Sequence, residues 1–338
     1  MIITRNATIR RLAVLGAATV GSTCAAVALA APQAHAAGES AVVQGDTLTI
    51  DAGSGADRLA LRLLAGSPNV LQVDFDDDGS AEHSFDRATF SRIDVSMGSG
   101  DDVFRVDQTN GAFADEALSI DGGSGNDGLN GGDGVEVFVG GSGRDAVDGN
   151  RGDDTGLLGS GDDSFRWDPG DGSDVVEGGS GTDTLDFNGA GANEVMSLSP
   201  NGSRSLFLRD VANIRMDMDD VEQLDLTALG GVDTVTINDM SGTDFRLAAV
   251  DLSGPAGGGD QQADRVIVNG SDESDDIDVS TDGARVDVTG LQTTTTITGA
   301  ELADLLQVNG LGGDDTIDVD DAVAAVMGTS LDLGADES

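Results

Sequence analysis

Short runs of alternating apolar and polar residues recur along the chain, and turn-forming Gly, Asp and Asn separate them. Val70–Phe75, Arg285–Val288 and Thr316–Val319 are examples. Alternation at period two predicts strands that bury one face. No segment after residue 36 has the length and period of a long helix, and 320–326 predicts at most a short one. The pattern therefore predicts an all-β chain built from many short strands.

A nine-residue unit repeats in tandem from Gly122 to Asp186. Seven blocks share G-G-x-G-x-D-x-U-x, where U is apolar, and Trp167-Asp168 interrupts the phase once. Position four is Gly in every block. Position six holds the acids Asp127, Glu136, Asp145, Asp154, Asp163, Asp174 and Asp183. Position eight holds Leu129, Phe138, Val147, Gly156, Phe165, Val176 and Leu185. This phase over seven copies is a strong sign of a repeat architecture.

The residue types of the block predict a cation site at each turn. Glycine at positions one, two and four permits positive φ and brings backbone carbonyls close together. The acid at position six adds a carboxylate to that turn. Such an oxygen set suits Ca²⁺, which takes six to eight oxygen ligands, better than Mg²⁺, which demands strict octahedral geometry. Residues seven to nine then form a short strand with position eight pointing inward.

These blocks resemble the RTX, or haemolysin-type, calcium-binding repeat family. The resemblance implies a parallel β-roll with two blocks per turn, in which each Ca²⁺ lies between loops two blocks apart. It pairs Asp127 with Asp145, Glu136 with Asp154, and Asp145 with Asp163, and leaves the pairing across Trp167-Asp168 open. Glu136 and Gly156 depart from the family pattern. The resemblance also implies backbone ligands from Gly123, Gly125, Gly141, Gly143, Gly161, Gly179 and Gly181.

The flanking regions repeat over a longer distance. Residues 263–279 and 303–319 are identical at nine of 17 positions, and 229–237 is a partial third copy. Isolated copies of the turn stand at Gly53–Asp57 and Gly98–Asp102, and these are weaker metal candidates because a site needs loops from neighbouring coils. The flanks predict further β-solenoid-like repeats and resemble secreted bacterial calcium-binding proteins of unassigned role.

Four regions follow from these patterns. They are a signal peptide (1–36), an N-terminal β region with degenerate repeats (37–121), the nonapeptide β-roll (122–188) and a C-terminal β region with repeats of roughly 40 residues (189–338). The signal peptide is indicated by early Arg residues, an apolar run over 12–31 and Ala34-His35-Ala36 before the cleavage point. It predicts a secreted protein, and its removal takes away the single Cys, Cys24.

Composition narrows the class of protein. The chain of 338 residues has 62 acidic and 17 basic residues, all of the latter Arg, for a formal net charge of −45. This charge excludes a nucleic-acid-binding protein, which needs a basic face, and argues against docking on anionic lipid. Aromatic residues make up 3% of the chain, which argues against an ordinary dense core.

Two other motifs point to weaker alternatives. Asp74–Gly79 matches the first half of an EF-hand loop, but position twelve is Phe85 rather than Glu. The favoured interpretation is an acidic hairpin turn. After removal of the signal peptide, His83 is the remaining His, and no Cys, Lys or Tyr is present. Acid pairs such as Asp153-Asp154 could imitate a glycosidase dyad, but their periodicity is better explained by the repeat.

The sequence thus favours a secreted, non-catalytic protein that Ca²⁺ folds. An envelope or matrix protein rigidified by Ca²⁺, with a cell-wall or matrix polysaccharide or protein as partner, is the first alternative. A β-helical polysaccharide lyase or glycosidase is the second. The possibility that the acids merely cap turns, and that the blocks fold without metal, stays open. The sequence does not determine the oligomeric state.

Overall fold

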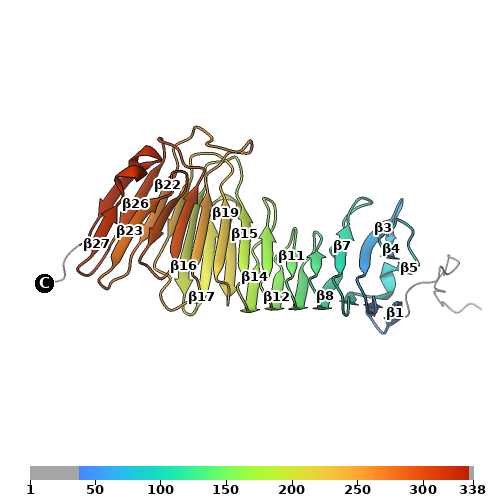
Figure 1. Ribbon diagram of the computed structural model, residues 1–338. Helices are drawn as coiled ribbons and strands as arrows, with labels where there is room; N and C mark the ends of the chain where they lie inside the picture. The colour runs from blue at the N-terminus through green and yellow to red at the C-terminus, as the bar shows by residue number, and fades with distance from the viewer. Residues whose placement is uncertain (1–37, 335–338) are drawn as a thin grey trace, which may run out of the picture.

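The computed structural model describes residues 38–334, and the expected signal peptide lies outside the described residues. The chain winds into one elongated stack of coils, with its N-terminal coils at one end and its C-terminal coils at the other (Figure 1). Each coil contributes strands to two facing sheets, and each sheet contains 14 strands. The prediction of an all-β, solenoid-like fold is therefore confirmed.

Sheet A comprises, in spatial order, β1 (Ser40–Gln44), β2 (Thr47–Asp51), β6 (Arg92–Ser96), β8 (Ala117–Ser124), β10 (Glu136–Ser142), β12 (Thr155–Ser160), β14 (Val175–Ser180), β18 (Ile214–Asp219), β17 (Arg204–Arg209), β16 (Val195–Asn201), β20 (Thr234–Ile237), β22 (Arg265–Asn269), β26 (Leu305–Asn309) and β28 (Gly328–Asp332).

Sheet B comprises, in spatial order, β27 (Thr316–Val319), β23 (Asp276–Thr281), β24 (Val286–Thr289), β25 (Thr294–Thr298), β21 (Leu247–Asp251), β19 (Gln223–Thr227), β15 (Thr184–Asn188), β13 (Ser164–Trp167), β11 (Ala146–Asp148), β9 (Gly128–Asn130), β7 (Val103–Asp107), β3 (Arg58–Leu64), β4 (Ser67–Phe75) and β5 (His83–Asp86).

Helical structure in residues 38–334 is limited to three short 3₁₀ helices, η1 (Arg87–Thr89), η2 (Val211–Asn213) and η3 (Asp321–Ala325). The last one matches the short helix predicted over 320–326. None of the described helices is long and apolar enough to cross a membrane.

Two nonapeptide blocks make one coil of the central region. β8, β10, β12 and β14 pair in parallel in sheet A, while β9, β11, β13 and β15 pair in parallel in sheet B. Val137 lies beside Thr155, one coil further on. The pairing that the sequence left open is also defined: Thr155 lies beside Val175, so the coil containing Trp167-Asp168 is two residues longer and the strands stay in register.

Antiparallel hairpins add strands to the sheets on both sides of this central region. β3, β4 and β5 form an antiparallel group at the N-terminal end of sheet B. β16, β17 and β18 are inserted into sheet A, and β23, β24 and β25 into sheet B. The alternation of apolar residues predicted these strands, but it does not distinguish parallel from antiparallel neighbours.

The core is one continuous row of packed apolar side chains between the two sheets, and it extends from Leu48 to Met327. The apolar residues predicted to point inward at position eight are buried, as Phe138 and Phe165 illustrate. The prediction that a dense core would be absent was wrong, because aliphatic residues supply most of the packing. Trp167 stacks on Phe187, with ring centroids 4.1 Å apart.

Gly156 does not weaken this core. A Cβ added there would lie 2.8 Å from the ring of Phe165, so the missing side chain leaves room for that ring. A gap in the apolar pattern of one block is therefore filled by an aromatic residue of the next block.

The longer repeat also corresponds to stacked coils. Arg265 pairs with Leu305 in sheet A, and Asp276 pairs with Thr316 in sheet B, both at the offset of 40 residues seen in the sequence. The third copy, 229–237, instead supplies β20 of sheet A, although its counterpart at 311–319 supplies β27 of sheet B. Similar turns therefore occur on both edges of the stack.

Candidate metal centre

Acidic residues form a column along the edge where strands of sheet A lead into strands of sheet B. The backbone N–H of each acid donates to the carboxylate Oδ1 of the acid one coil further on, at 2.7–2.8 Å. We call this set the first column; its members are Asp57, Asp102, Asp127, Asp145, Asp163 and Asp183. At its end, the N–H of Asp183 donates to Glu222 at 2.8 Å.

A second column stands on the opposite edge, where strands of sheet B lead into strands of sheet A. The N–H of Glu136 donates to Asp154 Oδ1 at 2.7 Å, and the N–H of Asp154 donates to Asp174 Oδ1 at 2.8 Å. All seven acids predicted at position six therefore lie in these two columns. The three pairs implied by the resemblance, Asp127–Asp145, Glu136–Asp154 and Asp145–Asp163, are neighbours within them.

The two oxygens of each carboxylate in the first column have different environments. Oδ1 of the five acids after Asp57 accepts the hydrogen bond from the preceding coil, whereas Oδ2 is buried and has no hydrogen-bond partner in any of the six residues. In the second column Asp154 has the same orphaned Oδ2, but Glu136 Oε2 accepts the N–H of Gly132 at 2.9 Å. Since buried carboxylate oxygens are normally paired, this repeated exception calls for a missing partner.

Position-one glycines are needed for close approach rather than for positive φ, which corrects the sequence interpretation. Gly122 and Gly140 do not adopt positive φ. A Cβ on Gly122 would lie 2.7 Å from both Asp127 Oδ2 and the carbonyl oxygen of Gly140. A carboxylate oxygen and a carbonyl oxygen of the next coil therefore converge where a side chain would otherwise stand.

Positions two and four of the first column do have positive φ, as predicted. Gly123 has a φ of 95° and Gly125 of 133°. A Cβ on Gly141 would lie 2.1 Å from the carbonyl oxygen of Gly123, and one on Gly143 would lie 1.9 Å from that of Gly125. Gly161, Gly179 and Gly181 repeat this arrangement further along the column. Carbonyl oxygens are thus stacked beside the carboxylates.

Burial without a counter-charge raises the pKa of these carboxyl groups. Loss of hydration, together with the repulsion of neighbouring acids, raises the pKa of Asp154 to about 8 and that of Asp174 to about 7. The same cause raises the pKa of Asp145 and Asp183 to about 6, and that of Glu136 to about 6. The pKa values of Asp127 and Asp163 are also raised, mainly by burial. A bound cation would favour the charged form.

The two isolated turns identified in the sequence belong to the first column. Ser54, Ser99 and Ser124 pair in parallel across successive coils, which stacks 53–57 on 98–102 and the latter on the first tandem block. The sequence interpretation treated these turns as isolated, and the successive acids are 45 and then 25 positions apart along the chain. Their shared G-x-G-x-D pattern is the signal that could have joined them to the column.

A third column of acids continues in the C-terminal coils, but protein groups satisfy much of it. Glu194, Asp233, Asp264 and Asp304 repeat the N–H to carboxylate ladder at 2.8–3.0 Å. Arg209 is buried and forms an ion pair with Glu194, and Asp304 Oδ2 accepts the N–H of Glu301 at 2.7 Å. Asp233 alone of these four has an orphaned Oδ2. The Arg209 guanidinium therefore supplies at Glu194 the positive charge that a bound cation could supply at the other acids.

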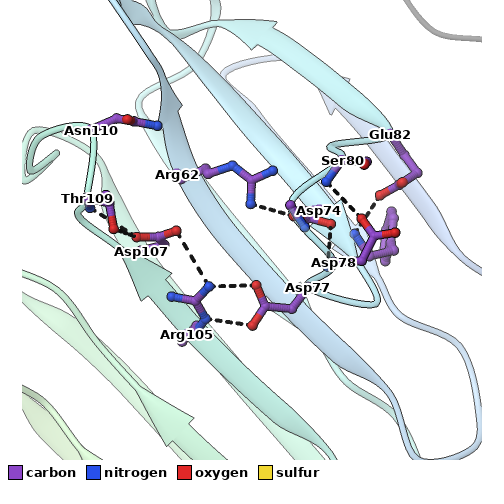
Figure 2. A network of polar contacts seen from close by, with 12 residues as sticks. Arg62, Asp74, Asp77, Asp78, Ser80, Glu82, Arg105, Asp107, Thr109 and Asn110 are labelled. Atoms are coloured by element: carbon purple, nitrogen blue, oxygen red, sulfur yellow. Dashed lines mark hydrogen bonds and ion pairs between the residues drawn. The ribbon is translucent and has the colours of Figure 1, made fainter.

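The half EF-hand is a hairpin turn between β4 and β5 (Figure 2). Asp74 is buried and pairs with Arg62, while its carboxylate also accepts the N–H of Gly79 at 2.9 Å. Arg105 binds both oxygens of Asp77, at 2.6 and 2.7 Å. Two guanidiniums thus pair with two of the four aspartates of this loop, in agreement with the interpretation as an acidic hairpin. His83 lies exposed on β5.

The donor set of the first two columns fits a hard cation that uses backbone oxygens. Within residues 38–334, no group of three or more His, Cys, Asp or Glu side chains gathers around one point. A zinc-type or carboxylate-only cage is therefore not formed by this part of the chain. The orphaned Oδ2 atoms and the stacked carbonyls are the mixed oxygen set that Ca²⁺ accepts.

Comparison of the chain with protein-family models, curated proteins and solved structures gave no significant match.

Proposed function

We propose that this protein is a secreted, non-catalytic calcium-binding repeat protein of the RTX type, in which Ca²⁺ bound between coils stabilises the central β-roll. Asp127, Asp145, Asp163 and Asp183 would hold ions in the first column, and Asp154 and Asp174, with Glu136, in the second. Glycine carbonyls at positions two and four would supply further oxygens. The ions would supply the positive charge that these buried carboxylates lack.

The observation that supports this proposal is the orphaned Oδ2 at each tandem-block position of the first column. An unpaired buried oxygen costs free energy, and a like-charged column adds repulsion. Glycine at position one keeps a space beside this oxygen in Asp127, Asp145 and Asp183, whereas Leu158 holds position one in the block of Asp163. Metal binding that occurs only in the folded state would convert this cost into stabilisation of the coil.

Asp145 provides the sharpest test, because it lies between Asp127 and Asp163. Calorimetric and circular-dichroism titrations with Ca²⁺ of the chain without residues 1–36 should show binding coupled to a gain of β signal. Asp145→Asn keeps an acceptor for the N–H of Asp127 but removes a charged ligand. We expect it to reduce the number of bound ions and the Ca²⁺-induced rise in melting temperature.

The matched control is Asp318→Asn, which removes one charge from an exposed strand position far from the columns. It should leave ion stoichiometry unchanged. A chain that binds no Ca²⁺ at ~1 mM, the weak end for extracellular modules, would contradict the proposal. So would a complete β signal in chelator that Ca²⁺ does not stabilise.

An envelope or matrix role is the second candidate, and the elongated stack in Figure 1 favours it. A rod whose coils contact only their neighbours can hold two attachment points apart, and inter-coil ions would stiffen it. Cell-wall pull-down with and without chelator would test this role. Retention on the wall that depends on Ca²⁺ would support it, and equal loss in the wash under both conditions would remove it.

A further inference from the structure

Residues outside the tandem blocks reproduce the oxygen arrangement of the first column. Asp102 has no solvent exposure, and Asp127, the next acid, is 2% exposed. Asp102 Oδ1 accepts the N–H of Asp57 at 2.7 Å, while its Oδ2 is buried without a partner. Asp57 Oδ2 is likewise buried and unpartnered. Asp102 therefore has the same half-satisfied carboxylate as the four acids that follow, and Asp57, the first acid of the column, shares their unpartnered Oδ2.

The carbonyl stack also continues through these turns with the same spacing. A Cβ on Gly98 would lie 2.1 Å from the carbonyl oxygen of Gly53, and one on Gly123 would lie 2.1 Å from that of Gly98. The Gly141–Gly123 pair in the tandem blocks gives the same distance, 2.1 Å. The position-four carbonyl of Gly100 accepts no hydrogen bond from the described residues.

Other acids at solenoid corners do not share this combination. Glu194 is paired with Arg209, and Asp304 Oδ2 accepts a backbone N–H. Asp233 has an orphaned oxygen, but the acid that follows it, Asp264, has Gln262 where the first column has glycine two residues before the acid. Asp315 also has an orphaned Oδ2 and is preceded by Gly313, but a Cβ on Gly313 would face the backbone of Glu273 rather than a glycine carbonyl. Orphaned carboxylates and stacked glycine carbonyls therefore coincide at Asp57 and Asp102, and not in the C-terminal coils.

We infer that two further divalent-cation sites lie outside the tandem repeat, one between the corners of Asp57 and Asp102 and one between those of Asp102 and Asp127. This inference rests on the proposed function, because it assigns the same ion to a longer column. Its consequence is specific: Ca²⁺ would fasten the N-terminal coils, including β3 and β7, to the central roll. The cation column would then span six coils rather than four.

Asp102→Asn tests the inference in the chain without residues 1–36. The amide is isosteric and keeps an acceptor for the N–H of Asp57, so the coil can still form. Native mass spectrometry in Ca²⁺ should show loss of both ions that share Asp102. Hydrogen exchange should show lost Ca²⁺-dependent protection in β3 and β7, with protection of β13 and β15 retained. Asp101→Asn, which changes the same charge on an exposed neighbour, is the control and should retain all ions.

Asp145→Asn, measured alongside, separates the two proposals. If Asp145→Asn loses ions while Asp102→Asn keeps the wild-type number, the additional sites are disproved and the proposed function stands. If neither substitution changes the ion count, both proposals fail. If Asp102→Asn and Asp101→Asn lose ions equally, the loss reflects general charge rather than coordination, and the inference is overturned.

Discussion

Each aspartate of the first column after Asp57 uses one carboxylate oxygen to join two coils, and under the proposed function its other oxygen would bind a cation. Oδ1 accepts the N–H of the neighbouring coil, so the side chain is held in one orientation before any ion binds. In Asp127, Asp145 and Asp183, Oδ2 is then fixed beside the position-one glycine of the same block. Such a prearranged ligand loses little side-chain entropy on binding. Glu136 instead turns its second oxygen onto the N–H of Gly132, which makes it the weakest ligand of the predicted set.

The raised pKa values predict that acid stabilises the metal-free protein. A carboxyl group whose folded pKa is raised contributes stability that is fully present below its unfolded pKa, 3.8 for Asp154. That contribution is lost as the pH rises through the folded pKa, about 8 for Asp154 and about 7 for Asp174. The melting temperature of metal-depleted protein should therefore rise as the pH falls from 8 to about 5.

With saturating Ca²⁺ the slope should have the opposite sign, because protons compete with the ion for the same carboxylates. Asp154→Asn should flatten the metal-free slope between pH 6 and 8, whereas Asp318→Asn, at an exposed position, should not. Thermal melts across this pH range, with and without Ca²⁺, measure both effects. Metal-free protein that is less stable at the acidic end of the range would refute the assigned burial of these groups.

At the scale of the element, the corner between strands sets which residues are allowed. At the corners of the first column, positions two and four have positive φ, and position one has no room for a Cβ wherever it is glycine. The spacing of glycine, acid and apolar residue was enough to predict the short strands, the inward residue and the neighbouring coils. It was not enough to predict the role of Gly122, because close approach of a carboxylate is a contact between residues that only the folded corner creates.

Gly140→Ala tests this corner directly. The added methyl would lie 2.4 Å from the carbonyl oxygen of Leu158 and 2.7 Å from Asp145 Oδ2. Neither atom can move without disturbing the column, so we expect destabilisation of about 1–3 kcal/mol in Ca²⁺, as for other overpacked sites. Denaturant unfolding in saturating Ca²⁺ measures it.

Gly191→Ala is the matched control, since Gly191 has no atom near its added Cβ and does not need positive φ. It should be neutral, or stabilising by about 0.4–1 kcal/mol through the unfolded chain. Equal destabilisation by both substitutions would show that the position-one space has no special role.

For the whole molecule, the distribution of paired and unpaired acids predicts uneven stability. The C-terminal coils neutralise Glu194 with Arg209 and satisfy Asp304 with a backbone N–H. The central coils have no such protein partner for Oδ2 of their first-column acids. Because coils in a solenoid contact mainly their neighbours, one part can open while another stays folded.

Chelation should therefore raise hydrogen exchange in β8–β15 well before it does so in β20, β22 and β26. Segment-resolved hydrogen exchange during stepwise removal of Ca²⁺ would measure this order. Simultaneous loss of protection in both regions would indicate one cooperative unit and would contradict the division drawn from the acids.

Sequence periodicity predicted the central roll and further solenoid-like repeats in both flanks, but not which flanking corners stack on one another. Tandem phase is lost between Asp57 and Asp102 because hairpin β4–β5 is inserted there, and between Glu194 and Asp233 because β16–β18 intervene. Folding restores the adjacency of corners that insertions separate along the chain. Which corners become adjacent is decided by long-range strand pairing, which short sequence motifs do not encode.

The two extra residues at Trp167-Asp168 lengthen one coil. The N–H of Asp163 nevertheless donates to Asp183 Oδ1 at 2.8 Å, as in the neighbouring coils. A turn on one edge of the stack can therefore be lengthened without changing the strand register on the opposite edge. This makes the turn after β13 a natural position for grafting a foreign peptide, such as an epitope or a fluorophore tag. The peptide would be displayed on the side of the rod, while the opposite edge kept the hydrogen-bonded corners of the first column.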